Sequence, residues 1–192
     1  MKLLLTFLFF TIPTFSFSQT NEISQVSNAN YASFIMYHRF GDSRYPSTNI
    51  KKEQFLKHIN ELIKPKYSII SIEKALQAIN NIEPTRDRSV VITIDDAYSS
   101  VYKYAWPIFK KYSLPFTLFV STDVIDNKTP GYMNWEQIRI LRDHGVTIGS
   151  QTKSHPHMFK LSREKIIQEL SISNKRFIDE IGSTPKYFAY PY

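Results

Sequence analysis

The chain of 192 residues contains no cysteine. Disulfide bonds, thiolate metal ligands and a cysteine nucleophile are therefore excluded, and no lipobox can be present. A protein of this kind must rely on its apolar core or on a metal for stability. The chain also lacks a glycine-rich loop of the kind that cradles phosphates, which argues against nucleotide chemistry.

Long apolar runs are scarce as well, and the clear example lies at the N-terminus. The run 3–12 follows Lys2 and is succeeded by Pro13 and a segment of small residues that ends at Ser18. This pattern predicts a secretory signal peptide over residues 1–18, with cleavage after Ser18. An uncleaved membrane anchor is the alternative, but the run is short for a membrane span. We therefore expect an exported protein that is periplasmic, on the cell surface or extracellular.

Acidic residues are fewer than basic ones. The chain has 17 Asp and Glu against 24 Lys and Arg, which gives a formal net charge of +7. This excess suits adhesion to an anionic envelope or polymer, with mild surface basicity of no functional meaning as the alternative. Nucleic-acid binding is not expected, since the basic residues are scattered and the protein is predicted to be exported. Membrane contact is expected only through the signal peptide, and the oligomeric state is left open.

Two kinds of apolar segment alternate beyond a polar linker, which we place at residues 19–32. Short β-branched or aromatic runs predict strands over residues 33–38, 67–70, 89–94, 116–120, 146–150 and 187–190. Amphipathic stripes and capping residues predict helices over residues 55–63, 71–79, 99–112, 135–142 and 162–181. The alternation predicts one parallel α/β domain over residues 33–192, with a barrel-like architecture. Because the chain stops directly after the last predicted strand, we expect the domain to be incomplete at its C-terminus, with the last strands missing.

Two adjacent carboxylates, Asp95 and Asp96, follow the predicted strand 89–94. Ligands and chemistry collect at the carboxyl ends of parallel strands, and two like charges there need a compensating cation. Further along the chain, the segment 149–157 follows the short apolar run 146–148 and contains two histidines. Aspartate and histidine at the ends of neighbouring strands outline a site for a first-row metal. The alternative is that Asp95 and Asp96 cap the helix predicted to begin near Ser99.

Three segments, taken in order, resemble motifs of the polysaccharide deacetylase family, also called carbohydrate esterase family 4. Residues 93–97, Thr-Ile-Asp-Asp-Ala, are similar to the family's Thr-Phe-Asp-Asp-Gly. Residues 149–155, Gly-Ser-Gln-Thr-Lys-Ser-His, are similar to its Gly-Ser-His-Thr-x-x-His. Residues 188–192, Phe-Ala-Tyr-Pro-Tyr, are similar to its Phe-Arg-x-Pro-Tyr. The segment Met-Tyr-His at 36–38 also resembles the opening of deacetylases that act on poly-N-acetylglucosamine exopolysaccharide.

The resemblance implies a distorted (β/α) barrel that binds one divalent cation, of the zinc, cobalt, nickel or iron class. It also implies a hydrolase that removes acetyl groups from an acetylated polysaccharide of the cell envelope or the extracellular space, based on N-acetylglucosamine. Carried over by position, Asp95 matches the general base, and Asp96 and His155 match metal ligands. Tyr192 matches the residue whose backbone N–H helps to bind the oxyanion. His38, Tyr98 and Tyr190 are candidates for substrate binding.

The chain departs from the family pattern at three places. Gln151 stands at the position of the first histidine ligand, and an amide oxygen binds zinc-like ions more weakly than an imidazole does. His157, two residues beyond His155, is an alternative ligand. Ala189 replaces the arginine that usually orients the base. The family's two later motifs, one of which holds a histidine used as catalytic acid, have no counterpart before Tyr192.

Three hypotheses follow from these residues. The first is a metal-dependent carbohydrate deacetylase that acts on carbon–nitrogen bonds other than peptide bonds. The second is a non-catalytic glycan-binding relative or an inactive fragment, which Gln151 and the missing motifs favour. The third sets the resemblance aside and assigns a phosphoryl-transfer enzyme that uses Asp95 and Asp96 with magnesium. The lack of a phosphate loop and the predicted export weaken the third hypothesis.

Overall fold

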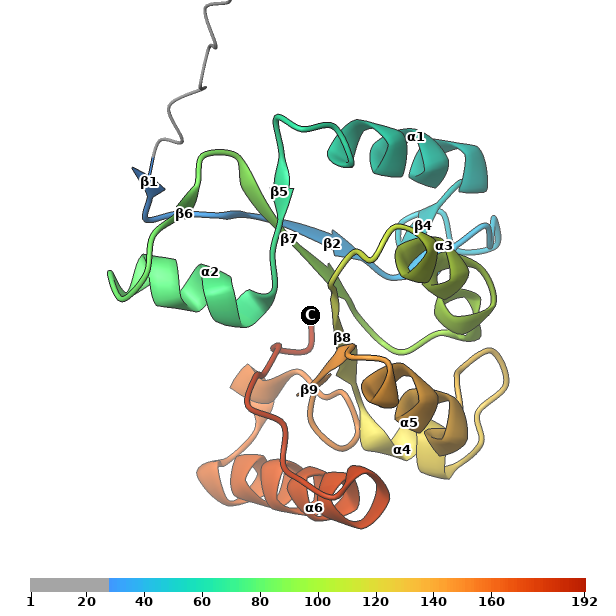
Figure 1. Ribbon diagram of the computed structural model, residues 1–192. Coiled ribbons are helices and arrows are strands. Elements are labelled where there is room, and N and C mark those ends of the chain that lie inside the picture. Colours follow the sequence, from blue (N-terminus) through green and yellow to red (C-terminus); the bar gives the residue numbers. More distant parts are fainter. Residues whose placement is uncertain (1–27) are drawn as a thin grey trace, which may run out of the picture.

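The computed structural model describes residues 28–192 (Figure 1). The predicted signal peptide, residues 1–18, and the linker residues up to 27 lie outside the described residues. The core of the fold is a parallel sheet of five strands. Four of them run in the order β2 (Ser33–Tyr37), β7 (Ser89–Ile94), β8 (Thr117–Val120) and β9 (Thr147–Ser150), and β5 (Ser68–Ile69) pairs with the start of β7. The predicted parallel α/β fold is confirmed.

Strand β7 is the centre of the sheet, and all six of its residues are buried. Its β-branched sequence suits a strand that is covered on both faces. The register pairs Tyr37 with Ile94 and Ile94 with Leu118, and the last residue of β8 pairs with the last residue of β9. The residues that follow these four strands therefore meet at one edge of the sheet.

Close packing between β8 and β9 depends on Gly149. A Cβ atom at this position would lie 2.4 Å from the Phe119 ring, nearer than a side chain allows. Glycine is thus the residue that lets the two strands lie together while a large aromatic ring fills the space beside them.

In the described part of the chain, six α-helices flank the sheet (Figure 1). They are α1 (Lys52–Leu62), α2 (Ile72–Ile79), α3 (Trp106–Lys111), α4 (Thr122–Asp126), α5 (Trp135–Asp143) and α6 (Arg163–Ile181). A π-helical turn over Val101–Ala105 leads into α3, and a 3-10 turn over Met158–Lys160 precedes α6. Both α4 and α5 contact α6. Apolar residues of these helices form one large core with the sheet, including Phe55, Ile59, Phe109, Ile138 and Phe177.

The predicted helix ends are confirmed at three positions. The Ser71 side chain accepts a hydrogen bond from the backbone N–H of Lys74 at the start of α2, and Ser162 caps α6 in the same way. Gly182 ends α6 with a left-handed backbone, φ 78°. Each of these signals is local, because a cap satisfies backbone groups within one turn of the helix.

Two short strand pairs lie outside the main sheet. One joins β1 (Asn28–Ala29) to β6 (Thr85–Arg86) in antiparallel orientation, and the other joins β3 (Arg39–Phe40) to β4 (Asn49–Ile50) in parallel orientation. The first pair includes residues that we placed in the linker, so the last part of that segment is tied to the domain. No helix within residues 28–192 is long and apolar enough to cross a membrane.

Three segments differ from the expected elements. The strand expected over residues 187–190 is reduced to a single parallel bridge between Ser150 and Phe188, and Pro191 just beyond it has no N–H to extend a ladder. The helix expected over residues 99–112 begins with the π-helical turn. Helix α4 was not expected, because five residues are too few to show a helical period. Within residues 28–192, β2 and β9 do not pair, so the sheet is open there.

Candidate active site

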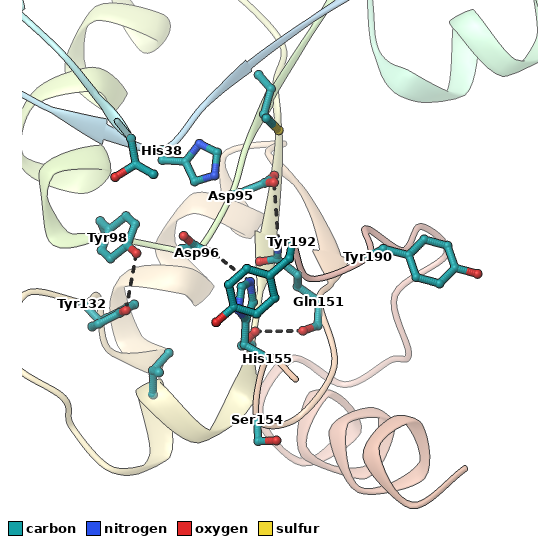
Figure 2. A pocket seen from close by; sticks show the side chains of 14 residues that line it. His38, Asp95, Asp96, Tyr98, Tyr132, Gln151, Ser154, His155, Tyr190 and Tyr192 are labelled. Atoms are coloured by element: carbon teal, nitrogen blue, oxygen red, sulfur yellow. Dashed lines mark hydrogen bonds and ion pairs between the residues drawn. The ribbon is translucent and has the colours of Figure 1, made fainter. Parts of the chain in front are cut away.

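A cavity of about 550 Å³ lies at the carboxyl edge of the sheet (Figure 2). It contains eight of the nine residues that the sequence singled out: His38, Asp95, Asp96, Tyr98, Gln151, His155, Tyr190 and Tyr192. The exception is His157, whose ring is stacked on the ring of Tyr192 with the centroids 3.9 Å apart. Residues that follow three strands, β2, β7 and β9, thus come together with the last residues of the described chain, as parallel topology requires.

Asp95 follows directly after β7 and is buried, with 7% of its surface exposed. Its backbone N–H donates to the carbonyl oxygen of Tyr37, and its Oδ2 lies 3.5 Å from Nε2 of Gln151. Burial raises the pKa of Asp95 to about 6, against the opposing charge of His38 and with a further contribution from Asp96. This carboxyl group is therefore ionised at neutral pH but takes up a proton more readily than an ordinary aspartate.

Asp96 has the opposite electrostatic character. Its Oδ1 lies 3.2 Å from Nε2 of His155, and its side chain is 14% exposed. Burial acts to raise the pKa of Asp96, but contacts with the His155 ring and the Tyr98 hydroxyl outweigh burial and hold the pKa below its ordinary value. Two neighbouring carboxylates whose pKa values are moved apart can serve as a base and as a permanent anion.

The backbone around the cavity is strained at five residues that are not glycine. Positive φ angles occur at Asp96 (70°), Ala97 (54°), Thr152 (70°), His155 (57°) and Tyr192 (64°). Each such residue costs on the order of 1–3 kcal/mol, and strain of this kind collects at functional sites. At Ala97 the similar family motif has glycine, which would adopt this conformation freely. The strained turns place the side chains of Asp96 and His155 opposite one another.

The loop that carries His155 is fixed by helix α6. The Glu169 carboxylate accepts hydrogen bonds from the backbone N–H groups of Lys153 (3.1 Å) and Ser154 (2.8 Å) and from the Ser154 hydroxyl (2.7 Å). The buried Ser173 hydroxyl donates to the carbonyl oxygen of Thr152 at 3.2 Å. Our reading of the sequence missed both residues of α6. Their spacing of four, which puts them on one face of the helix, was the available signal.

Two buried atoms and the partly buried Asp96 carboxylate suit a divalent cation. Gln151 is 2% exposed, and its Oε1 has no hydrogen-bond partner within the described chain. Nε2 of His155, beside Oδ1 of Asp96, is also buried without a well-directed hydrogen bond. Buried polar atoms without partners are costly, and an ion held by carboxylate, imidazole and amide oxygen would satisfy them. No three His, Asp or Glu side chains within residues 28–192 gather as a metal site, so an ion bound here would need Gln151 as its third ligand.

Aromatic side chains form one wall and the mouth of the cavity. The rings of Tyr98 and Tyr132 lie with centroids 4.7 Å apart, and their hydroxyl groups are 3.5 Å apart. Tyr190 and Tyr192 are 73% and 80% exposed at the mouth. The Tyr192 ring also contacts the edge of the His155 ring, at 4.8 Å between centroids. Aromatic rings with one exposed face are suited to packing against sugar rings.

Comparison with known proteins identifies the class of this protein. Residues 82–192 match the family described as polysaccharide deacetylase. The chain belongs to that family, as the three motifs and the carboxylate pair at the end of β7 had indicated.

Individual relatives agree with this assignment. Over 157 residues the chain is 26% identical to YxkH of Bacillus subtilis, a protein named as a polysaccharide deacetylase, covering 82% of this chain and 55% of YxkH. Over 180 residues it is 23% identical to the poly-beta-1,6-N-acetyl-D-glucosamine N-deacetylase of Staphylococcus aureus. This match covers 88% of this chain and 62% of the relative. The structure of IcaB from Ammonifex degensii superposes with a TM-score of 0.72 at 26% identity, covering 86% of this chain and 75% of that one. The predicted fold of the deacetylase type is thus confirmed, and the chain spans 55% to 62% of the length of these two curated relatives.

Proposed function

We propose that this protein is a metal-dependent hydrolase that removes acetyl groups from a polysaccharide based on N-acetylglucosamine. The observation that carries the proposal is the pair Asp95 and Asp96, adjacent in sequence and oppositely shifted in pKa, at the floor of a cavity that also holds His155 and Gln151. The substrate class is supported by the similarity to the poly-N-acetylglucosamine deacetylase of Staphylococcus aureus.

Asp95 is the proposed general base. Its carboxylate lines the cavity and takes the proton of the water molecule that attacks the acetyl carbonyl carbon. A pKa of about 6 leaves the group ionised at neutral pH and makes it a stronger base than an ordinary aspartate. The Gln151 amide donates one long hydrogen bond to Oδ2 of Asp95, with Nε2 at 3.5 Å.

Asp96, His155 and the side-chain oxygen of Gln151 are the proposed ligands of one divalent cation. When bound, such an ion supplies Lewis-acid chemistry, because it polarises a carbonyl group and lowers the pKa of water. The low pKa of Asp96 keeps this ligand ionised. His157 is not included, since its ring is engaged with Tyr192. The mixed oxygen and nitrogen set is compatible with the zinc, cobalt, nickel and iron class, with weaker binding than two imidazoles would give.

The remaining cavity residues are assigned to the substrate. The backbone N–H of Tyr192 is the proposed donor to the oxyanion, which forms when water adds to the carbonyl group. His38, Tyr98 and Tyr190 are proposed to hold the sugar through hydrogen bonds and ring contacts. A polysaccharide substrate lies outside the cytoplasm, so we also propose export through the signal peptide at residues 1–18.

Removal of the base tests this function. We predict that Asp95→Asn lowers acetate release from N-acetylglucosamine oligomers by about 10²–10⁴-fold, because a positioned proton acceptor is lost. Its circular dichroism spectrum and its metal content should stay those of the parent. Asp143→Asn, at an exposed aspartate of α5 outside the cavity, is the matched control and should keep full activity. Equal activity of Asp95→Asn and the parent would refute the proposed role.

A second candidate function rests on Gln151. With an amide in place of the family's histidine, the protein can be a glycan-binding relative without catalytic activity. Calorimetry with the same oligomers separates the two functions. If the parent binds them without releasing acetate, the protein is the glycan-binding relative.

A further inference from the structure

A second cavity, of about 470 Å³, lies beside the candidate active site. Tyr98 and Tyr132 line both cavities and therefore form the wall between them. The wall is rigid, because the two tyrosines are joined by an antiparallel backbone bridge as well as by their ring contact. Since the two cavities share Tyr98 and Tyr132, they adjoin one another.

Arg39 lines the second cavity and packs between two aromatic rings. Its guanidinium carbon lies 3.9 Å from the centroid of the Tyr45 ring and 3.6 Å from that of the Tyr98 ring. Nη1 donates to the hydroxyl of Thr48, and the backbone N–H of Arg39 donates to the carbonyl oxygen of Thr48. The stacked rings and these hydrogen bonds hold the positive charge in one place.

The Arg39 charge contributes to the low pKa of Asp42, but Arg44 contributes more and makes the hydrogen bonds to that carboxylate. The acidic residue of this cavity, Asp42, is engaged by Arg44 through two contacts of 2.8 Å. Within residues 28–192, Arg39 takes part in no ion pair. The second cavity therefore presents a fixed positive charge and unused N–H donors next to the active site.

We propose that this second cavity binds the sugar unit next to the one being deacetylated, and that Arg39 makes it prefer a neighbour that still carries its acetyl group. This inference rests on the proposed function. An N-acetylated unit is neutral and offers carbonyl and hydroxyl oxygens to the guanidinium group. A unit that has lost its acetyl group carries a protonated amine, which the Arg39 charge repels. The enzyme would then space its deacetylations along the polymer instead of working through adjacent units.

Binding measurements in the Asp95→Asn variant test the preference, because the ligand is not consumed there. Calorimetry compares a β-1,6-linked trimer of N-acetylglucosamine with the same trimer lacking the acetyl groups of its outer units, at mildly acidic pH. The Arg39 guanidinium and a protonated amine would be two like charges a few ångströms apart near a surface. We therefore expect the fully acetylated trimer to bind about 3- to 30-fold more tightly than the partly deacetylated one. Arg39→Gln should bring this ratio to about 1, whereas Arg39→Lys, which keeps the charge, should retain most of it.

Two controls support the interpretation. Arg163→Gln removes the same charge from an exposed position of α6 outside both cavities, and it should leave the ratio unchanged. Raising the ionic strength from about 0.02 to about 0.5 M should shrink the ratio, since salt screens an exposed charge. This measurement needs no substitution at Arg39 and decides the matter if Arg39→Gln does not fold.

Equal affinity for the two trimers at low salt would overturn the inference, as would an unchanged ratio in a folded Arg39→Gln variant. Acetate release by the parent without this discrimination would overturn the inference and leave the proposed function standing. Failure to bind either trimer would refute both.

Discussion

Glu169 lies outside the cavity and yet is expected to control the affinity of the metal site. Its carboxylate accepts three hydrogen bonds from Lys153 and Ser154, the two residues that precede His155. Glu169→Ala leaves two backbone N–H groups without an acceptor. At about 1–3 kcal/mol for each donor left without a partner, the native loop conformation loses about 2–6 kcal/mol, part of which water restores. Because His155 has a strained backbone, φ 57°, the loop should relax away from its native conformation.

The assay is the affinity for a divalent cation, measured by calorimetry alongside the melting temperature. We expect Glu169→Ala to weaken cation binding by about 10- to 100-fold, as loss of a group that orients a ligand does. Glu169→Gln keeps one acceptor oxygen for the two N–H groups and should restore most of the affinity. Glu83→Ala, at an exposed glutamate outside the cavity, is the control. If Glu169→Ala lowers the melting temperature but binds the cation as the parent does, Glu169 does not control the affinity of the metal site.

Two further predictions concern the cavity itself. In metal-free protein, the raised pKa of Asp95 means that the stability contributed by this group is lost as pH rises from about 4 to about 6. Asp95→Asn should therefore be more stable than the parent by about 1–3 kcal/mol at pH 7 and equal to it below pH 4. Identical pH profiles in urea unfolding would contradict this. Gln151→His should tighten zinc binding by about 10- to 100-fold, because imidazole is a better ligand than an amide. Unchanged zinc affinity in a folded variant would show that residue 151 does not contact the ion.

Sequence patterns predicted those features that depend on local physical chemistry. The run of β-branched residues in β7 indicates a strand buried on both faces, and Ser71, Ser162 and Gly182 satisfy helix ends within a single turn. The edge of the sheet where the site lies follows from parallel topology alone.

Other features depend on partners distant in the sequence. Residues 187–190 have the composition of a strand, but only Phe188 has a bridge partner in β9. Arg39 is separated by about sixty residues from Tyr98, so no local pattern could place its charge between two rings. The raised pKa of Asp95 arises from burial, which the sequence does not encode at a single position.

Hydrolysis in this cavity is measured best by the amounts of acetate and free amine formed from an N-acetylglucosamine oligomer. The purified chain is supplied with a divalent cation, and we expect equal amounts of the two products. We expect no product after chelation and none in Asp96→Ala, because removal of that carboxylate removes a proposed ligand. Binding of the oligomer with no acetate at any cation concentration would show that this cavity does not hydrolyse acetyl groups.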